Sequence, residues 1–249
     1  MPASIIVTND DGIHSANLLA LADKLEARFG NSVCVIAPEA QQSATSHTIT
    51  LHKPLRINRV AKGRYAASGT PVDCVYVGLL KMAQNPRLVI SGINDGHNLG
   101  TDVFYSGTVG GAAEGGLRGI PSMAVSLAHG AFDKLDAATD LAVALAEKLI
   151  DGWIEPPTVL NVNIPANWEG ATRWTSLGRR HYEDDVHERI DPRGRRYYWI
   201  GGGIAGSDLA KGSDCEAIDL GIASITPLSM DLTHSGFLAN PPVIDLNIP

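Results

Sequence analysis

The chain has 249 residues, of which 44% are hydrophobic and 19% are charged. This composition supplies enough apolar surface for a folded core and too little charge for a disordered chain. Acidic residues outnumber basic ones by 27 to 20, so the net charge is −7, which argues against a protein whose main ligand is a nucleic-acid backbone.

The sequence shows no pattern of export or membrane insertion. Its first residues contain no positively charged region before a short apolar run, and no stretch approaches the ~18 apolar residues of a membrane span. The three cysteines, Cys34, Cys74 and Cys215, are scattered without Cys-x-x-Cys spacing, so neither a disulfide framework nor a thiolate zinc site is indicated. We therefore expect a cytoplasmic protein with no membrane partner.

The first elements alternate strand and helix. A β-branched run at residues 4–8 predicts a strand, and the apolar residues that follow at helical spacing predict a helix that ends at Gly30. A second buried-strand pattern at residues 33–37 comes next. Two strands joined by a helix indicate a right-handed βαβ unit and a parallel sheet.

The same alternation continues to about residue 165. Thr70 is a predicted helix N-cap, followed by a proline and an acid, and this helix extends to about Met82. The other predicted elements are strands at 88–91, 122–127 and 159–164, and helices at 108–118 and 135–150. This order is typical of an open, doubly wound, mostly parallel α/β sheet flanked by helices.

The pattern changes between residues 167 and 214. This segment combines arginines with the aromatic run Tyr197-Tyr198-Trp199 and lacks helical periodicity, so we expect an extended hairpin arm within a single domain that spans residues 1–249. A last predicted strand at 222–228 is placed to rejoin the sheet. Single-strand nucleic-acid binders also combine charge with aromatic residues, but the net charge and the absence of a nucleic-acid motif argue against that function. A contact between protein chains or a solvated hairpin is expected instead.

Polar side chains follow three of the predicted strands, at the edge where open α/β sheets bind ligands. The segments are Asn9-Asp10-Asp11-Gly12, Gln41-Gln42-Ser43 and Ser91-Gly92-Ile93-Asn94. Adjacent carboxylates repel each other unless a cation neutralises them, and Mg²⁺ or Mn²⁺ prefers oxygen ligands. These segments supply a candidate divalent-metal site with the ligands Asp10, Asp11, Ser43 and Asn94. The alternative is an ordinary turn with helix-capping acids.

A second candidate site lies where the next helix begins. The loop after Asn94 passes through Asn98 and reaches Tyr105-Ser106-Gly107-Thr108 at the predicted helix start. Free backbone amides, hydroxyl groups and the positive end of a helix suit a phosphate group. The alternative is a flexible loop with an ordinary serine cap.

These motifs resemble the SurE family of stationary-phase survival proteins, which are metal-dependent nucleotidases. The resemblance covers nearly the whole chain and depends on the segments 8–12, 38–43, 68–75, 91–115, 224–228 and 231–233. It implies a Rossmann-like core with a protruding arm. It also implies one Mg or Mn ion per subunit, and a homodimer or homotetramer formed through the arm and the C-terminal segment.

The resemblance also implies roles for single residues. The metal ligands are the same four as above, and Asn98 and the Ser106-Gly107-Thr108 turn hold the phosphate. Asn9 orients the first loop or contacts the phosphate. Three features depart from the family pattern. Ala44 replaces a common glycine, and Ser15-Ala16-Asn17 replaces a frequent Ala-Pro-Gly. Glycines at 110 and 111 replace common alanines, which predicts a looser helix start.

The predicted reaction is hydrolysis of nucleoside 5′- and 3′-monophosphates, and of short polyphosphate, by metal-activated water. Asp10 and Asp11 are each a candidate ligand and a candidate base. The leaving-group acid is not identifiable, and His97 and His234 are candidates by residue type alone.

Other functions remain open at this stage. A non-catalytic nucleotide- or NAD-binding module would use the same framework. A covalent aspartyl-phosphate fits less well, because such enzymes usually have an Asp-x-Asp arrangement. The segment 201–206 matches the dinucleotide pattern G-x-G-x-x-G but lacks its βαβ setting. The segment 94–102 lacks the register of a calcium loop.

Overall fold

The computed structural model describes residues 3–183 and 185–239. The strands are β1 (Ala3–Thr8), β2 (Val33–Pro38), β3 (Ile57–Ala61), β4 (Arg64–Ala67), β5 (Ala83–Asp95), β6 (Ser122–Leu127), β7 (Val159–Ile164), β8 (Thr172–Trp174), β9 (Arg179–Tyr182), β10 (Asp185–Ile190), β11 (Arg196–Gly201), β12 (Ile204–Asp208) and β13 (Ala223–Leu228). The α-helices are α1 (Ala16–Phe29), α2 (Pro71–Val77), α3 (Gly107–Leu117), α4 (Leu135–Ile150), α5 (Asp214–Asp219) and α6 (Ser235–Leu238). Short helical turns are η1 (Gly30–Ser32), η2 (Gly78–Met82), η3 (Gly100–Phe104) and η4 (Phe132–Lys134).

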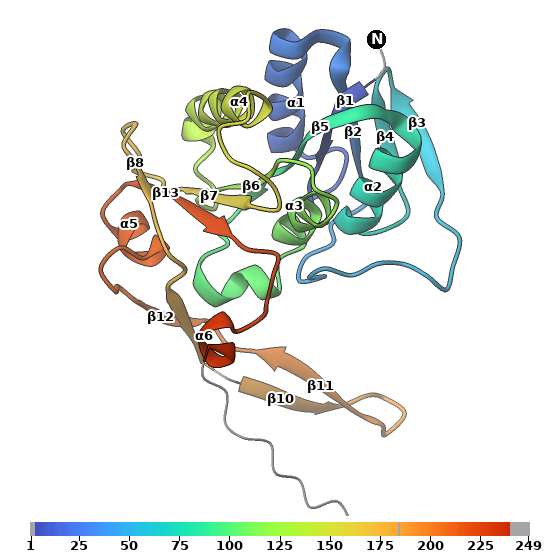
Figure 1. Cartoon of the computed structure of the whole chain (residues 1–249). Helices are drawn as coiled ribbons and strands as arrows, with labels where there is room; N and C mark the ends of the chain where they lie inside the picture. The colour runs from blue at the N-terminus through green and yellow to red at the C-terminus, as the bar shows by residue number, and fades with distance from the viewer. Residues whose placement is uncertain (1–2, 184, 240–249) are drawn as a thin grey trace, which may run out of the picture.

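Nine strands form the main sheet, in the order β3-β4-β2-β1-β5-β6-β7-β13-β8. The strands from β4 to β7 are parallel to their neighbours in this order, and β13 rejoins the sheet antiparallel to β7. Helices cover both faces, with α1 and α4 packed together on one face and α2 against α3 on the other (Figure 1). The predicted mostly parallel α/β sheet is therefore confirmed.

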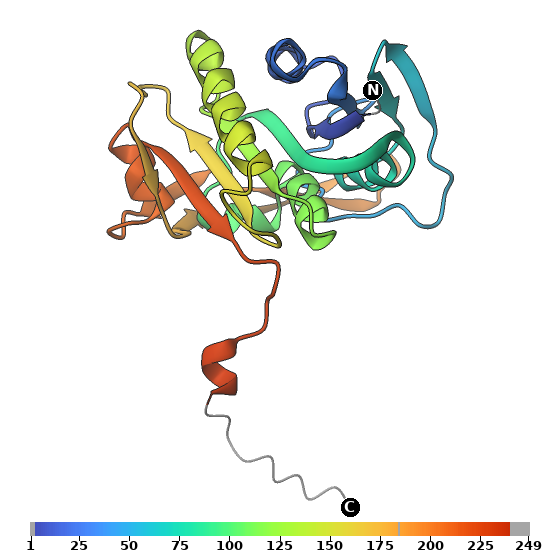
Figure 2. The ribbon, with the colours of Figure 1, turned by 45° about the horizontal axis from the view of Figure 1, so that its top comes forward.

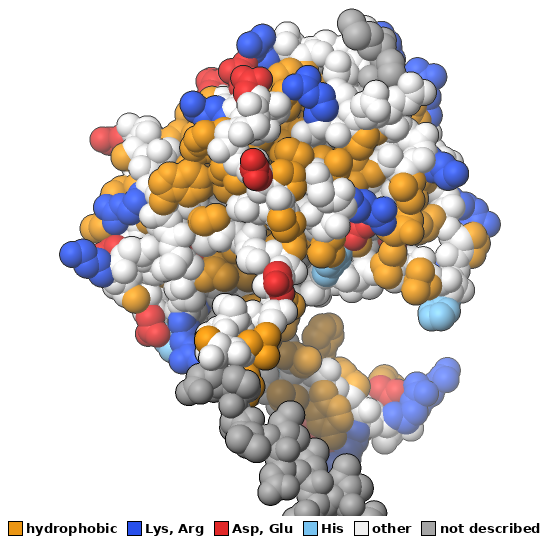
Figure 3. Space-filling view, in the orientation of Figure 1, with side chains coloured by type: hydrophobic (Ala, Val, Ile, Leu, Met, Phe, Trp, Pro, Cys, Tyr) orange, Lys and Arg blue, Asp and Glu red, His pale blue; other side chains and the backbone are white. Residues whose placement is uncertain are grey.

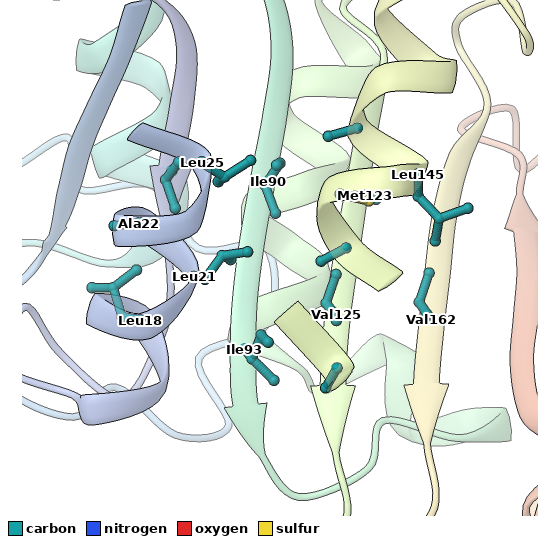
Figure 4. Packing of buried hydrophobic residues seen from close by; sticks show 14 of the residues in the cluster. Leu18, Leu21, Ala22, Leu25, Ile90, Ile93, Met123, Val125, Leu145 and Val162 are labelled. Carbon is teal, nitrogen blue, oxygen red and sulfur yellow. The ribbon is translucent and has the colours of Figure 1, made fainter. Parts of the chain in front are cut away.

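The largest part of the core lies between the sheet and the pair α1 and α4. Leu18, Leu21 and Leu25 are buried on α1, and Leu21 and Leu25 point toward Ile90 of β5. Met123 of β6 lies beneath α4 (Figure 4). Burial of aliphatic side chains on one face of each helix gives this layer its stability, at about 25 cal/mol per Å² of apolar surface removed from water. The sheet edge that carries the candidate site is therefore held on a rigid layer.

The predicted caps are present at two helices. Thr70 accepts a hydrogen bond from the Asp73 amide (3.2 Å), and the Asp73 carboxylate accepts one from the Thr70 amide (2.9 Å), which forms a capping box. Gly30 ends α1 with φ of +64°, a backbone conformation that favours glycine.

The predicted arm is present as two consecutive antiparallel strand pairs, β9 with β12 and β10 with β11. The pair β10 and β11 projects from the body (Figure 1). Within the segment 167–214, β8 instead joins the main sheet beside β13. The segment 201–206, which matches the dinucleotide-binding pattern, spans the connection from β11 to β12, where Gly202 has φ of +106°. The strand β12 follows it in place of a helix, so the βαβ setting is missing.

Three features differ from the sequence predictions. The hairpin β3–β4 was not predicted, because β3 is largely exposed and lacks an alternating apolar pattern. Strand β5 runs from Ala83 to Asp95, beyond the predicted 88–91, because only its central part is buried on both faces. The short helix α5 begins at Asp214, where the arm was expected to end.

After β13 the chain leaves the sheet, and α6 lies away from it (Figure 2). Residues 240–249, which belong to the C-terminal segment predicted to mediate assembly, lie outside the described residues. Within 3–183 and 185–239, no helix combines the length and the apolar character needed to cross a membrane.

Candidate metal and phosphate site

A cleft of about 250 Å³ opens at the carboxyl edge of the sheet. The side chains that line it are Asp10, Asp11, Gln41, Ser43, Ala44, Asn94, Asp95, Asn98, Asp102, Tyr105, Ser106 and Tyr182. The cleft therefore brings together all four predicted metal ligands and two of the predicted phosphate-binding residues, Asn98 and Ser106.

Asn9 holds the first loop in place from beneath the cleft. It is fully buried, its amide nitrogen donates to the Gly12 carbonyl, and its side-chain oxygen accepts from the Gly12 amide (both 3.2 Å). The carbonyl of Asp10 accepts a hydrogen bond from the Gln42 amide (2.7 Å), which joins the first loop to the second. Asn9 therefore orients the loop, and it does not line the cleft.

The two adjacent aspartates lie in an environment that disfavours negative charge. Burial raises the pKa of Asp10 to about 6, the charge of Asp11 adds to this shift, and a hydrogen bond from Thr108 opposes it. Burial also raises the pKa of Asp11, and the charge of Asp95 acts in the same direction. A bound cation would relieve this cost because it favours both carboxylates in their ionised form.

Ser43 lies on a loop with an uncommon backbone conformation. Ala44 has φ of +56° and Ser46 has φ of +54°. Both lie in the left-handed region of backbone conformation, which residues other than glycine rarely adopt. The Ser46 amide donates to the Tyr105 carbonyl (3.0 Å), so the loop is tied to the chain just before α3. The glycine that Ala44 replaces in the resembling family matches this conformation.

Asn94 lies inside the extended strand β5, whereas the sequence predicted it in a loop after the strand. Its amide nitrogen donates to the Gly96 carbonyl (2.7 Å), so its oxygen is the atom available to a cation. The pairing of β5 with β6 shifts register between Ser91 and Asn94. A Cβ on Gly92 would lie 2.4 Å from the Val125 carbonyl oxygen, so this close approach requires glycine.

The N-terminus of α3 faces Asp10. Ser106 is the N-cap, and its hydroxyl accepts from the Val109 amide (3.0 Å). The amides of Gly107 and Thr108 are at the first two helical positions, which have no partner within a helix. The hydroxyl of Thr108 donates to Asp10 Oδ1 (2.5 Å), and its backbone amide also favours the ionised carboxylate, so Thr108 acts mainly on Asp10.

The glycines of α3 let the helix approach its surroundings closely. A Cβ on Gly107 would lie 2.8 Å from Thr45 Oγ1, and one on Gly110 would lie 2.6 Å from the Ser46 carbonyl oxygen. The expectation of a looser helix start is therefore wrong, because these glycines permit tight packing of α3 against the Ser43 loop.

Asn98 is held by β6 and β7. Its side-chain nitrogen donates to Ser126 Oγ (2.8 Å). Its backbone amide donates to Asn163 Oδ1 (2.8 Å), and its backbone carbonyl accepts from the side-chain nitrogen of Asn161 (2.8 Å). This network fixes the position of Asn98 at the cleft.

Sequence reasoning missed several residues of the cleft. Asp95 directly follows Asn94, but its carboxylate accepts from the Gly130 amide (2.9 Å) and pairs with His129 (3.0 Å). Asp102 and Tyr182 meet across 80 positions of the chain, where the Tyr182 hydroxyl donates to Asp102 Oδ1 (2.6 Å). Asp95 could have been found from the sequence, because it directly follows Asn94. Asp102 and Tyr182 could not, because the contact between η3 and the arm leaves no pattern in the sequence.

The two histidines considered as acids lie elsewhere. His97 Nε2 is 2.9 Å from the Ile164 carbonyl, and burial lowers its pKa. His234 caps α6 through its Nδ1, which accepts from the Phe237 amide (2.7 Å). Neither side chain lines the cleft.

The donor set of the cleft fits a hard divalent cation. Within the part of the chain that the structure describes, no three His, Cys, Asp or Glu side chains are grouped to hold a metal by themselves. Two carboxylates, a hydroxyl and an amide oxygen, with water completing the shell, match the preference of Mg²⁺ and Mn²⁺ for oxygen ligands. The adjacent carboxylates of the buried Asp10 and the half-buried Asp11 also need a positive charge nearby.

Comparison with known families agrees with this fold. The family model described as Survival protein SurE matches residues 5–184. The chain belongs to the SurE family.

Close relatives and a solved structure cover nearly all of the chain. It is 46% identical over 239 residues to the 5′-nucleotidase SurE of Anaeromyxobacter sp. (strain Fw109-5), covering 94% of this chain and 92% of that protein. It is 47% identical over 234 residues to the protein of the same name from Sorangium cellulosum (strain So ce56), covering 92% and 90%. The crystal structure of the SurE protein from Aquifex aeolicus matches with a TM-score of 0.79 and 36% identity, covering 95% of this chain and 97% of that one.

Proposed function

We propose that this protein is a divalent-metal-dependent nucleotidase that hydrolyses nucleoside monophosphates to nucleoside and phosphate. Membership of the SurE family makes it a hydrolase acting on phosphoric monoesters, and its relatives carry the name 5′-nucleotidase SurE. The observation that carries the proposal is the pair of a buried Asp10 and a half-buried Asp11 in one cleft, with Asp10 in contact with the N-terminus of α3. This arrangement offers one place for a cation and an adjacent place for a phosphate.

The proposed ligands of one Mg²⁺ or Mn²⁺ ion are Asp10, Asp11, Ser43 and Asn94. Such a cation, when bound, polarises a phosphoryl oxygen and lowers the pKa of a coordinated water. Thr108 holds Asp10 in position through its hydroxyl, while Asn94 presents its oxygen because its nitrogen is engaged with Gly96. Asp10 and Asp11 are also the proposed catalytic residues.

The proposed phosphate site consists of the amides of Gly107 and Thr108 at the start of α3, together with Ser106 and Asn98. Backbone amides in the first turn and the positive end of the helix dipole stabilise the negative charge on the phosphoryl oxygens. Asn9 supports this site indirectly, because it fixes the loop that carries Asp10. Small nucleotides, and not nucleic-acid polymers, are the proposed partners.

The test is phosphate release from 5′-AMP, 3′-AMP and short polyphosphate after chelation and after Mg²⁺ or Mn²⁺ is restored. We expect metal-restored hydrolysis of the 5′ substrate, with 3′ and polyphosphate activity as the further proposals. Binding of 5′-AMP without turnover in any metal would instead favour the non-catalytic nucleotide-binding module.

We also propose that two or four copies assemble through the arm and the C-terminal segment. Apolar side chains gather on the face of the body over α3 and β13 (Figure 3). Phe104, Leu117 and Leu232 are more than half exposed there, and Met230 lines the same groove. Phe237 of α6 is 54% exposed on a segment that stands clear of the sheet, so the proposed occupant of the groove is α6 of a second copy.

Light scattering coupled to size-exclusion chromatography tests this assembly. We expect a dimer or tetramer for the full chain and a smaller species for Leu117→Asp. A monomeric wild-type protein would contradict the proposal.

A further inference from the structure

Two exposed tyrosines form part of the wall of the cleft. Tyr105 is 67% exposed and Tyr182 is 44% exposed, and both line the same cleft as Asp10 and Asp11. Tyr105 directly precedes the α3 N-cap, whereas Tyr182 ends β9 at the base of the arm. The arm therefore contributes a side chain to the site.

Asp102 fixes both tyrosines. Its carbonyl accepts from the Tyr105 amide (2.9 Å), and its carboxylate accepts from the Tyr182 hydroxyl (2.6 Å) and from Arg180 Nη1 (2.5 Å). The side chains of Asp102 and Arg180 are only 14% and 13% exposed, so this ion pair is shielded from solvent. One buried carboxylate thus holds a segment of the main body and the base of the arm in a fixed relation.

Because the Tyr182 hydroxyl is bonded to Asp102, the ring is the part of Tyr182 that can contact a ligand. Burial raises the pKa of Tyr182 to about 12, and the neighbouring Asp102 carboxylate acts in the same direction, so the hydroxyl stays protonated as the donor of this bond. Both carboxylate oxygens of Asp102 are engaged, by Tyr182 and by Arg180. Aromatic surface, rather than the Asp102 carboxylate, is what this side of the cleft offers to a ligand.

The size of the cleft places the rest of a nucleotide at this rim. The cleft measures about 250 Å³, which is less than the roughly 300 to 1,000 Å³ of pockets that enclose a whole small ligand. A phosphate at the start of α3, next to a cation on Asp10 and Asp11, would fill the inner part. The nucleoside must then extend toward the mouth, where Tyr105 adjoins the phosphate-binding turn.

We propose that Tyr105 and Tyr182 form the nucleobase platform of this site, and that the arm determines substrate preference through Tyr182. Aromatic rings stack on the faces of bases and tolerate different bases, because every base has such a face. This inference rests on the proposed function, and it adds the residues that distinguish a nucleotide from a phosphate ester without a base.

The experiment compares 5′-AMP with ribose 5-phosphate, which has the same phosphate and sugar but no base. The quantity measured is the ratio of kcat/KM for the two substrates, with Mn²⁺ present, in the full chain. Loss of one stacking partner should lower this ratio about tenfold in Tyr105→Ala and in Tyr182→Ala, since stacking contributes about 1 to 3 kcal/mol per base. We expect the loss mainly in KM for 5′-AMP.

Two further variants separate stacking from a structural effect. Tyr105→Phe keeps the ring and should retain the wild-type ratio. Tyr198→Ala removes a tyrosine on β11 that lies outside the cleft and is 58% exposed, between the values of Tyr105 and Tyr182, and it should also retain the wild-type ratio. Circular dichroism and thermal unfolding establish that each variant is folded.

The outcomes are distinct. Ratios within twofold of wild type in both alanine variants would overturn the platform, as would a wild-type protein that hydrolyses both substrates equally well. In those cases the nucleotidase proposal stands. Hydrolysis of neither substrate by the metal-loaded wild-type protein would overturn the proposed function itself, and the platform with it.

Discussion

The carboxyl edge of the main sheet and the projecting pair β10–β11 differ in which side chains they bury. The sheet edge buries polar side chains, whereas β10 and β11 expose apolar ones. At the sheet edge, polar residues such as Asn9, Asp10 and Thr108 are buried and hydrogen-bonded to each other or to nearby backbone. In β10 and β11 every residue is exposed, including the large side chains of Trp199 and Ile200. The first region buries polar groups at a cost in stability and thereby forms the candidate site. The second region exposes apolar surface that a partner could cover.

The base of the arm connects these two regions. Strand β9 brings Arg180 and Tyr182 to Asp102, so the arm is fixed to the site at one end and exposed at the other. A change at the sheet edge should therefore alter activity, a change in the core should alter stability, and a change at the arm tip should alter neither in a single subunit.

The largest effect is expected at the sheet edge. Asp10→Asn removes a charged ligand from the proposed metal site and should lower kcat/KM for 5′-AMP about 1,000-fold, because metal catalysis contributes several kcal/mol. Asp151→Asn, on the exposed C-cap of α4, serves as the control and should keep wild-type activity. Phosphate release measures both. Near wild-type activity of Asp10→Asn would remove this residue from the site.

The next largest effect is expected in the core. Leu21 is fully buried between α1 and the sheet, so Leu21→Ala should lower the free energy of unfolding by about 2 to 5 kcal/mol. Ile200, 91% exposed on the arm, should change it by less than about 0.5 kcal/mol when replaced by alanine. Urea denaturation at low protein concentration measures the difference. Equal losses would mean that the arm packs onto a core in solution.

A smaller effect is expected where α3 meets the Ser43 loop. Gly110→Ala places a Cβ 2.6 Å from the Ser46 carbonyl oxygen, and overpacking of this kind costs about 1 to 3 kcal/mol. Helix propensity alone would instead stabilise the variant by up to about 1 kcal/mol. The sign of the change in thermal stability therefore decides whether the loop and helix are in tight contact.

The smallest effect is expected at Ala44. Because its φ is +56°, Ala44→Gly should relieve backbone strain and raise the free energy of unfolding by about 0.5 to 1 kcal/mol, after the entropy that glycine adds to the unfolded chain. Ala40→Gly, whose backbone is not in the left-handed region, should lower it. A destabilised Ala44→Gly variant would show that the loop tolerates alanine at no cost.

Much of the fold could be predicted because its signals are local. The helix that begins after Thr70 and the strand at 159–164 follow from caps and from short apolar runs, and both are present. The hairpin β3–β4 could not be predicted in this way, because β3 is an edge strand whose side chains mostly face solvent. Its position depends on pairing with the parallel sheet rather than on its own pattern.

The site divides along the same line. Asp10 and Ser43 follow β1 and β2, and Asn94 lies at the carboxyl end of β5 in the same parallel sheet, so topology brings them together and the sequence could predict it. Tyr182 reaches the cleft through the geometry of the arm and its bond to Asp102, a long-range contact with no periodic or motif signal. Residues supplied by the arm had to be found in the structure.

The central claim is that the adjacent pair Asp10 and Asp11 holds a divalent cation. It is tested most directly by the thermal unfolding of chelated protein titrated with Mn²⁺, compared with Asp10→Asn. Saturable binding at 100 times the Kd should stabilise the wild-type protein by about 2.7 kcal/mol and raise its Tm by about 5 to 10 °C. The variant should respond little at the same concentrations. An unchanged Tm in the wild-type protein, or an equal rise in Asp10→Asn, would contradict the account.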